Sequence, residues 1–157
     1  MDSEEIKQKE IEYAKELSKS MLAWEREKQE LLPIILKRKG LDMIISNIPA
    51  IIILTRFKEM CSPENIPYCE LYRNKKKCHE HLEELNCGLC NCPNYDAKHI
   101  GQQEEKTLVG KCNIKSKKGY YHFSKSYPRV GVWSCEECQV HHSERFMEKY
   151  LKKTLPE

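Results

Sequence analysis

The sequence Asn86-Cys87-Gly88-Leu89-Cys90-Asn91-Cys92-Pro93 indicates more about this protein's structure than any other stretch of the chain. Cys87 and Cys90 stand at the C-x2-C spacing with which two thiolates bind one metal ion. Gly88 permits the tight turn that this spacing requires. Cys92 follows two residues later, so its thiol can complete the same site or belong to a second one.

A second knuckle, Cys135-Glu136-Glu137-Cys138, is separated from the first by residues 91–134 and is followed by His142. Two cysteines with a histidine a few positions later are a familiar group of zinc ligands. The intervening segment must fold back if both knuckles bind one ion. Further candidate ligands lie outside the two knuckles: Cys69, Cys78, Cys112 and His79.

The number of candidate ligands predicts two metal ions. The cysteines from Cys69 to Cys138 exceed the four ligands of one tetrahedral site, so we expect two zinc ions or a cluster of two metals. Thiolates also hold iron–sulfur clusters. However, the run C-x2-C-x-C-P is tighter than that of bacterial ferredoxins and lacks its fourth cysteine. We expect zinc, and an iron–sulfur protein with a redox or enzymatic role is the alternative.

The chain shows a surplus of sulfur ligands, whereas a catalytic zinc site leaves one position open for water. It contains no H-E-x-x-H and no H-x-E…P-C-x-x-C deaminase pattern. We therefore expect structural ions whose binding helps the segment to fold, and we predict no catalytic residues.

The composition is consistent with reduced thiols. All nine cysteines of the 157-residue chain lie at or beyond Cys61. The charged N-terminal sequence lacks the apolar core of a secretory signal, and no apolar run reaches the roughly 20 residues that a bilayer requires. We therefore expect a cytoplasmic protein without a membrane span, in which clustered thiols bind metal rather than form disulfides. The net charge of +3 excludes a strongly polycationic or polyanionic protein.

The change in composition near Cys61 predicts two regions: a helical N-terminal region, residues 1–60, and a cysteine-rich metal-binding module, residues 61–157. Asp2 and Glu5 have capping-box spacing at the start of the first helix. Lys28 interrupts an apolar helix face, whose members are Tyr13, Leu17, Met21, Trp24, Leu31 and Ile35. This face can pack within the helical region or on the module, or it can bind a partner protein or a second copy of the chain.

Several residues predict where the helices begin and end. Pro33 indicates the end of the first helix or a kink in it, and Gly40 is a candidate C-cap. Asn47 and Pro49 indicate the start of another helix. At the other end of the chain, Phe146, Tyr150 and Leu151 predict a short closing helix that packs back on the module.

The segment before the second knuckle suggests a nucleic-acid surface. Cations and aromatic rings alternate there, as in proteins that bind single-stranded nucleic acid, at Lys115, Lys117, Lys118, Tyr120, Tyr121, Lys125 and Arg129. The alternative is a solvated loop whose aromatic rings pack around the metal core. RNA or a ribonucleoprotein is therefore one candidate partner, and a protein bound through the N-terminal helices is the other.

The cysteine pattern resembles the cysteine-rich small domain of archaea and bacteria, a module with a metal-binding role. The resemblance covers about residues 66–151, and its most specific part is the N-C-x-x-C-x-C-P stretch. It departs from the family at His141, where a proline is usual, and in the longer spacing between Cys69 and Cys78. It implies that the ligands are Cys69, Cys78, Cys87, Cys90, Cys92, Cys112, Cys135, Cys138 and His142.

The sequence thus predicts a small α+β or irregular module organised by metal and preceded by an α-helical region. The function we expect is that of a non-catalytic, zinc-binding protein that presents a rigid surface to a macromolecular partner.

Overall fold

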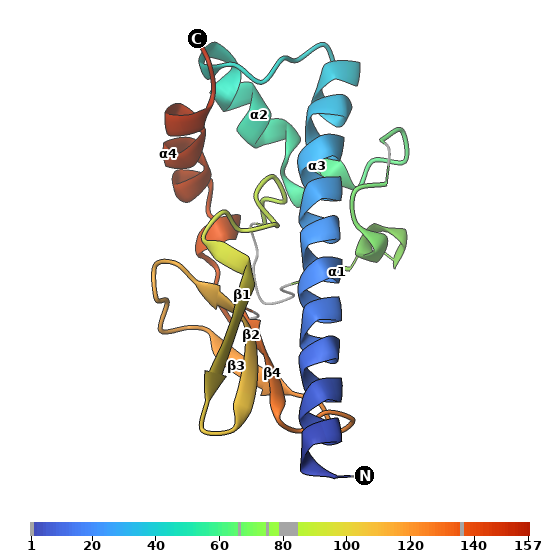
Figure 1. Ribbon diagram of the computed structural model, residues 1–157. Helices are drawn as coiled ribbons and strands as arrows, with labels where there is room; N and C mark the ends of the chain where they lie inside the picture. Colours follow the sequence, from blue (N-terminus) through green and yellow to red (C-terminus); the bar gives the residue numbers. More distant parts are fainter. Residues whose placement is uncertain (1, 66, 75, 79–84, 136) are drawn as a thin grey trace. The chain divides into compact units, whose positions relative to one another are not determined.

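The computed structural model describes residues 2–65, 67–74, 76–78, 85–135 and 137–157, apart from the side chains of residues 73 and 74. It is an α+β structure, as the sequence predicted, with four α-helices and a four-stranded sheet in this part of the chain (Figure 1). The helices are α1 (Ser3–Arg38), α2 (Ile48–Leu54), α3 (Phe57–Met60) and α4 (Glu144–Thr154), and the strands are β1 (Tyr95–Gln103), β2 (Lys106–Cys112), β3 (Tyr120–Phe123) and β4 (Val130–Ser134).

The residues form two compact units, and neither is continuous in sequence. The sheet unit contains residues 1–26 and 93–138, and the helical unit contains residues 27–92 and 139–157. The predicted division at residues 60 and 61 marks the change in composition, but it falls inside the helical unit. Helix α1 supplies a segment to each unit because its apolar face continues through both segments.

The sheet unit is built on a mixed sheet of order β1-β2-β4-β3. Strands β2 and β4 are parallel, whereas the other two pairs are antiparallel. The core contains Val109 and Val130, which pack with Ala14 of α1. The rings of Tyr13 and Tyr127 stack with their centroids 4.0 Å apart. The first part of the predicted apolar helix face is therefore covered by the protein's own sheet.

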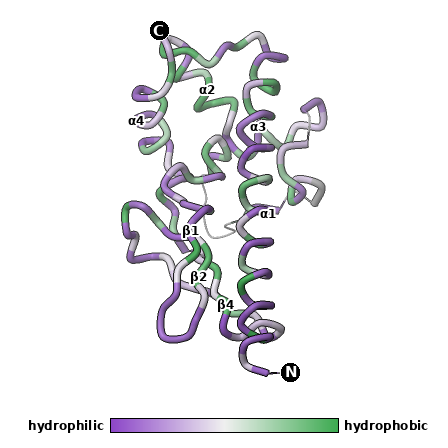
Figure 2. Tube along the Cα trace, viewed as in Figure 1, coloured by the Kyte–Doolittle hydropathy of each residue, from purple (hydrophilic) through white to green (hydrophobic). Residues whose placement is uncertain are grey.

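The helical unit has its own core. It joins the last turns of α1 to α2 and α4, and its most deeply buried side chains are Ile35, Leu36, Ile51, Met60, Tyr68 and Met147. Figure 2 shows the hydrophobic run of α2, which contributes Ile48 and Ile51 to this core. Helix α4 is the predicted closing helix. Its N-cap is Ser143, whose hydroxyl accepts a hydrogen bond from the Phe146 amide.

The predicted caps at the two ends of α1 are both confirmed. The Glu5 amide donates to Asp2 Oδ1 over 2.9 Å. Gly40 has a φ of +78°, and the amides of Gly40 and Leu41 bond the carbonyls of Lys37 and Leu36, as in a Schellman C-cap.

Pro33 does not end the helix, which continues to Arg38. A proline inside a helix removes one hydrogen bond and costs about 3 kcal/mol. Burial of Leu32, Ile35 and Leu36 around it offsets that cost, because each contributes roughly 1.5–3 kcal/mol when fully buried.

No helix in the described part of the chain has both the length and the apolar character needed to cross a membrane.

Gly119 provides a test of the sheet unit. A Cβ atom there would overlap with Cζ2 of Trp133, in the strand paired with β3. We expect Gly119→Ala to lower the free energy of unfolding by about 1–3 kcal/mol, because the indole would have to leave its place. Urea unfolding followed by tryptophan fluorescence measures this, with Lys118→Ala at the exposed neighbouring residue as the control. Equal stability of the two variants would contradict the packing described.

Candidate metal centre

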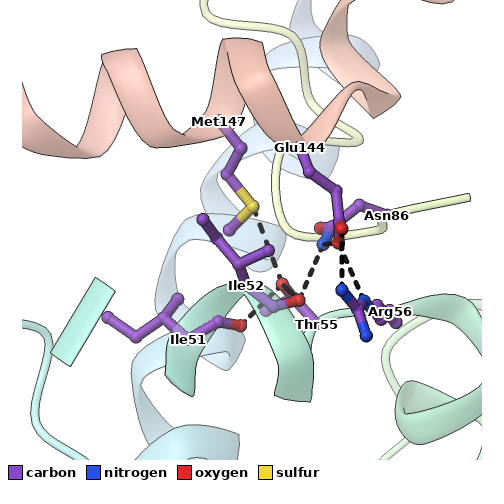
Figure 3. Close-up of polar contacts among 7 residues, drawn as sticks. All are labelled: Ile51, Ile52, Thr55, Arg56, Asn86, Glu144 and Met147. Carbon is purple, nitrogen blue, oxygen red and sulfur yellow. Dashed lines mark hydrogen bonds and ion pairs between the residues drawn. The ribbon is translucent and has the colours of Figure 1, made fainter. Parts of the chain in front are cut away.

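The first knuckle is held in place by the buried side chain of Asn86, which is 2% exposed. Its amide nitrogen donates to the Ile52 carbonyl over 2.9 Å and to Glu144 Oε2 over 3.2 Å (Figure 3). Its side-chain oxygen accepts the Gly88 amide over 2.9 Å, which forms the turn between the two cysteines. Both ends of the Asn86 amide therefore have a hydrogen-bond partner, which explains why an asparagine suits this position.

Helices α2 and α4 provide the surroundings of Asn86. Arg56 donates two hydrogen bonds of 2.9 Å to the Glu144 carboxylate, and this pair lowers the pKa of Glu144 (Figure 3). Thr55 caps the end of α2 by donating to the Ile51 carbonyl, and its own carbonyl accepts the Cys87 amide over 2.8 Å. The knuckle is therefore fixed by backbone and side-chain bonds to regular helices.

His142 is held by the same residue. Its Nδ1 lies 2.8 Å from the Asn86 carbonyl oxygen, which can only accept a hydrogen bond. The hydrogen of the neutral ring is therefore on Nδ1, and Nε2 keeps its lone pair. Nε2 lies 3.6 Å from Cys78 Sγ. A histidine whose other ring nitrogen donates to a carbonyl is the usual arrangement at a metal centre.

Four predicted cysteine ligands line one small cavity of about 30 Å3 together with His142. We call it the four-thiol cavity, after its cysteines Cys69, Cys78, Cys87 and Cys90. The two knuckle thiols belong to Cys87 and Cys90. Cys69 and Cys78 precede them in the chain, and His142 follows in the short 3-10 helix Val140–His142.

The thiolate forms of Cys87 and Cys90 are destabilised in this cavity. Burial raises the pKa of Cys87 to about 12, although the nearby Tyr72 hydroxyl opposes the rise, and the other cysteines of the cavity add to it. Burial also raises the pKa of Cys90 to about 11, against the opposing effects of the Tyr68 hydroxyl and the Lys28 charge. A divalent cation in the cavity would reverse this, because it binds the thiolate form and releases the proton.

The residues fit a metal ion in chemistry, although the described side chains do not already form a coordination sphere. Within the described ranges, no group of three or more His, Cys, Asp or Glu side chains is placed to hold an ion as it stands. The Tyr72 hydroxyl is buried in the cavity wall without a hydrogen-bond partner among the described residues. A thiolate at Cys87 would give that hydroxyl an acceptor.

The sheet unit gathers three other predicted ligands at one end of its sheet. Cys112 ends β2 and Cys135 directly follows β4, and the carboxyl ends of these parallel strands lie at the same edge. The Cys138 amide bonds the Cys135 carbonyl over 2.9 Å, as in a knuckle turn. Cys138 Sγ lies 3.8 Å from the Ser116 hydroxyl, and Ser116 lines a cavity of about 320 Å3 with Cys112.

Cys92 and His79 are the two remaining predicted ligands. Cys92 is half-buried and is the last residue of the first segment of the helical unit. His79 lies outside the described residues. The two knuckles belong to different units.

The predicted nucleic-acid residues divide into two sets. Lys115, Lys117, Lys118, Tyr120 and Lys125 are exposed. Arg129 instead pairs with the buried Glu10 over 2.6 Å. The Tyr121 hydroxyl donates to the Gly110 carbonyl, and its ring packs edge-on against Trp133. Structural roles therefore occupy Arg129 and Tyr121, and the other five residues are exposed at the surface.

Sequence reasoning missed the aromatic and charged residues around the four-thiol cavity. Tyr68 and Tyr72 flank Cys69 at a spacing that carried no recognised motif. Lys28 was visible as the charge that interrupts an apolar helix face, and it is 7% exposed. A lysine at a core position requires a buried partner, and that signal could have pointed to this cavity.

Comparison of the chain with models of protein families, with curated proteins and with solved structures found no match. The resemblance to the cysteine-rich small domain therefore stays a prediction.

Asn86→Ala tests the support of the knuckle. The substitution removes three hydrogen bonds and leaves the Gly88 amide unpaired in a buried place, whereas the Ile52 carbonyl keeps the bond from the Thr55 hydroxyl. We expect the free energy of unfolding to fall by about 2–4 kcal/mol in urea titrations. Asn113→Ala, at an exposed asparagine, is the matched control and should change it by less than about 0.5 kcal/mol. A loss no larger than that of the control would show that Asn86 does not hold the knuckle.

Proposed function

We propose that this protein is a non-catalytic, zinc-binding protein whose ions stabilise the loops around its cysteines. The observation that supports this best is the convergence of Cys69, Cys78, Cys87, Cys90 and His142 on one cavity. Four of these five donors suffice for a tetrahedral site. Each thiol that binds releases its proton. Because the unfolded chain has no preformed site, the free energy of binding also becomes free energy of folding.

The donors of the cavity favour zinc over an iron–sulfur cluster. The ring nitrogen of His142 adds a ligand that zinc accepts readily beside thiolates. When bound, the ion would supply a positive charge that neutralises the buried thiolates.

A second ion in the sheet unit is supported by Cys112, Cys135 and Cys138 at one end of the sheet. We propose that this ion is independent of the first, because its three thiols lie in the other compact unit. The candidates for the fourth ligand of this ion are the remaining predicted ligands, Cys92 and His79.

Metal content tests both sites. We expect about two zinc ions and no colour for protein purified without oxygen, measured by elemental analysis and a visible spectrum. Cys90→Ser should remove about one ion, and so should Cys138→Ser, because each removes a ligand from a different unit. Cys61→Ser is the control and should keep both.

Three results would contradict parts of this proposal. Iron with acid-labile sulfide would favour the iron–sulfur alternative. Full zinc content in Cys90→Ser would show that the four-thiol cavity does not bind zinc. Loss of all zinc in both single variants would show that the cysteines form one site.

We also propose that the rigid surface beside the second knuckle binds RNA. Four exposed lysines and the exposed ring of Tyr120 lie on or beside β3, where they can meet phosphates and a base. A protein partner or homodimer reached through residues 1–60 stays a prediction.

Lys117→Glu with Lys118→Glu tests the RNA surface. We expect binding of single-stranded RNA to weaken by about tenfold or more at low salt, because two phosphate contacts are replaced by repulsion. Fluorescence anisotropy measures it, and Lys152→Glu with Lys153→Glu in the last turn of α4 is the control of equal charge. An unchanged affinity for RNA, or an equal loss of affinity in the control, would contradict this proposal.

A further inference from the structure

Two exposed lysines line the cavity of about 320 Å3 at the end of the sheet. We call it the lysine pocket, after Lys111 and Lys115, and its other lining residues are Cys112, Asn113, Ser116 and Trp133. All of them belong to the sheet unit. Pockets that hold small molecules commonly have volumes of roughly 300–1,000 Å3, so this one is large enough to receive a ligand.

The connection from β2 to β3 builds this pocket. Strand β4 lies between these two strands, so residues 113–119 must cross its carboxyl end to reach β3. The connection starts with a turn, in which the Lys115 amide donates to the Cys112 carbonyl over 3.1 Å. It ends at Gly119, which packs directly against the indole of Trp133. The order of the strands therefore brings Lys115 and Trp133, which lie far apart in the sequence, to one pocket.

The charge around the pocket is positive. The sequence contains no acidic residue between Glu105 and Glu136. Of the carboxylates that the structure describes, none forms an ion pair with Lys111 or Lys115. Asp96 stands opposite Lys111 in the register of β1 and β2, but it does not line the pocket, and its Oδ1 accepts the Lys98 amide over 3.0 Å. The pocket therefore favours an anion.

The backbone of Lys115 supports a role for its side chain. Its φ is +50°, in the left-handed region that glycine and asparagine adopt most readily. A residue with a long side chain raises the free energy of such a turn, and strained residues of this kind are common where a side chain is placed for a ligand. The turn thus presents a cation at a position that glycine would fill at lower cost.

The remaining lining residues indicate which anion fits. The ammonium groups attract a phosphate, and the part of the Trp133 indole that lines the pocket offers a base an apolar aromatic surface. The exposed Asn113 side chain adds an amide that can donate to the edge of a base and accept from it. Cations, an aromatic ring and an amide in one pocket together match a nucleotide better than a simple inorganic anion.

We infer that the lysine pocket binds one nucleotide of a single-stranded RNA, with the phosphate at Lys111 and Lys115 and the base against Trp133. The inference rests on the proposed RNA surface and extends it, because it names the unit that the surface recognises. A base that enters the pocket cannot stay paired, so the pocket selects single-stranded over duplex RNA. Both lysines are exposed, and the affinity therefore falls as the salt concentration rises.

The fluorescence of Trp133 reports on the pocket directly. The chain has two tryptophans, so Trp24→Phe leaves Trp133 as the only one. Full-length protein with this substitution, purified without oxygen, is titrated at low salt with adenosine 5′-monophosphate, and separately with adenosine and with inorganic phosphate. Lys111→Gln with Lys115→Gln removes both charges of the pocket. Lys149→Gln with Lys153→Gln, at two exposed residues of α4, is the control of equal charge.

We expect adenosine 5′-monophosphate to change the Trp133 emission saturably. Adenosine and inorganic phosphate should each bind about tenfold more weakly or less tightly still, because each meets only part of the pocket. Loss of both pocket lysines should weaken the nucleotide's binding by about tenfold, and the control should bind it as the parent does. Single-stranded RNA should displace the nucleotide, whereas a duplex of the same sequence and concentration should not. Far-ultraviolet circular dichroism verifies that each variant is folded.

Several outcomes would overturn the inference. The nucleotide could leave the Trp133 emission unchanged, or bind as tightly without the two lysines as with them. Equal affinity for inorganic phosphate would show a site for anions alone, and equal displacement by duplex RNA would contradict the preference for single strands.

The charge reversal at Lys117 and Lys118 distinguishes this failure from that of the proposed RNA surface. If that variant keeps its full affinity for RNA, the proposed surface fails, and the inference that rests on it fails as well. If the variant binds RNA more weakly while the nucleotide does not bind at Trp133, only the role of the lysine pocket is wrong.

Discussion

The buried amide of Asn86 is the interaction on which the helical unit depends. Its side chain bonds α2, α4 and the turn of the first knuckle, and its backbone carbonyl bonds His142. An aspartate could accept the Gly88 amide but could not donate to the Ile52 carbonyl, and it would place a second negative charge beside Glu144. Only an amide of this size satisfies all these partners, which explains why asparagine directly precedes the cysteine.

The four-thiol cavity combines opposing electrostatic effects. Burial raises the pKa of the Cys87 and Cys90 thiols, whereas two tyrosine hydroxyls and one ammonium group oppose that rise. Such groups are of little use to neutral thiols. They become favourable together when a cation converts the thiols to thiolates, so the surroundings suit a bound state better than an empty one.

The helices and the candidate ligands could be predicted from sequence because their signals are local. Asp2, Gly40 and the C-x2-C spacings each act within a few residues. The strands could not, because the β1–β2 turn is Glu104-Glu105, with positive φ values and without the asparagine or glycine that marks such turns. Pro33 indicated an end or a kink, and the helix does not end there because packing of Leu32 and Ile35, which depends on distant residues, outweighs a local penalty. The pairing of Lys28 with Tyr68 spans 40 positions, beyond any sequence pattern.

The discontinuity of the two units constrains the order of events during synthesis. Helix α1 leaves the ribosome before the strands that cover its first half, which are complete only after Ser134 has emerged. The helical unit needs Met147 and Leu151, which are made after all four strands. Both apolar halves of α1 therefore stay uncovered until these later segments emerge. The knuckle thiols of Cys87 and Cys90 also emerge before the unit that will enclose them can close, so metal capture can precede folding.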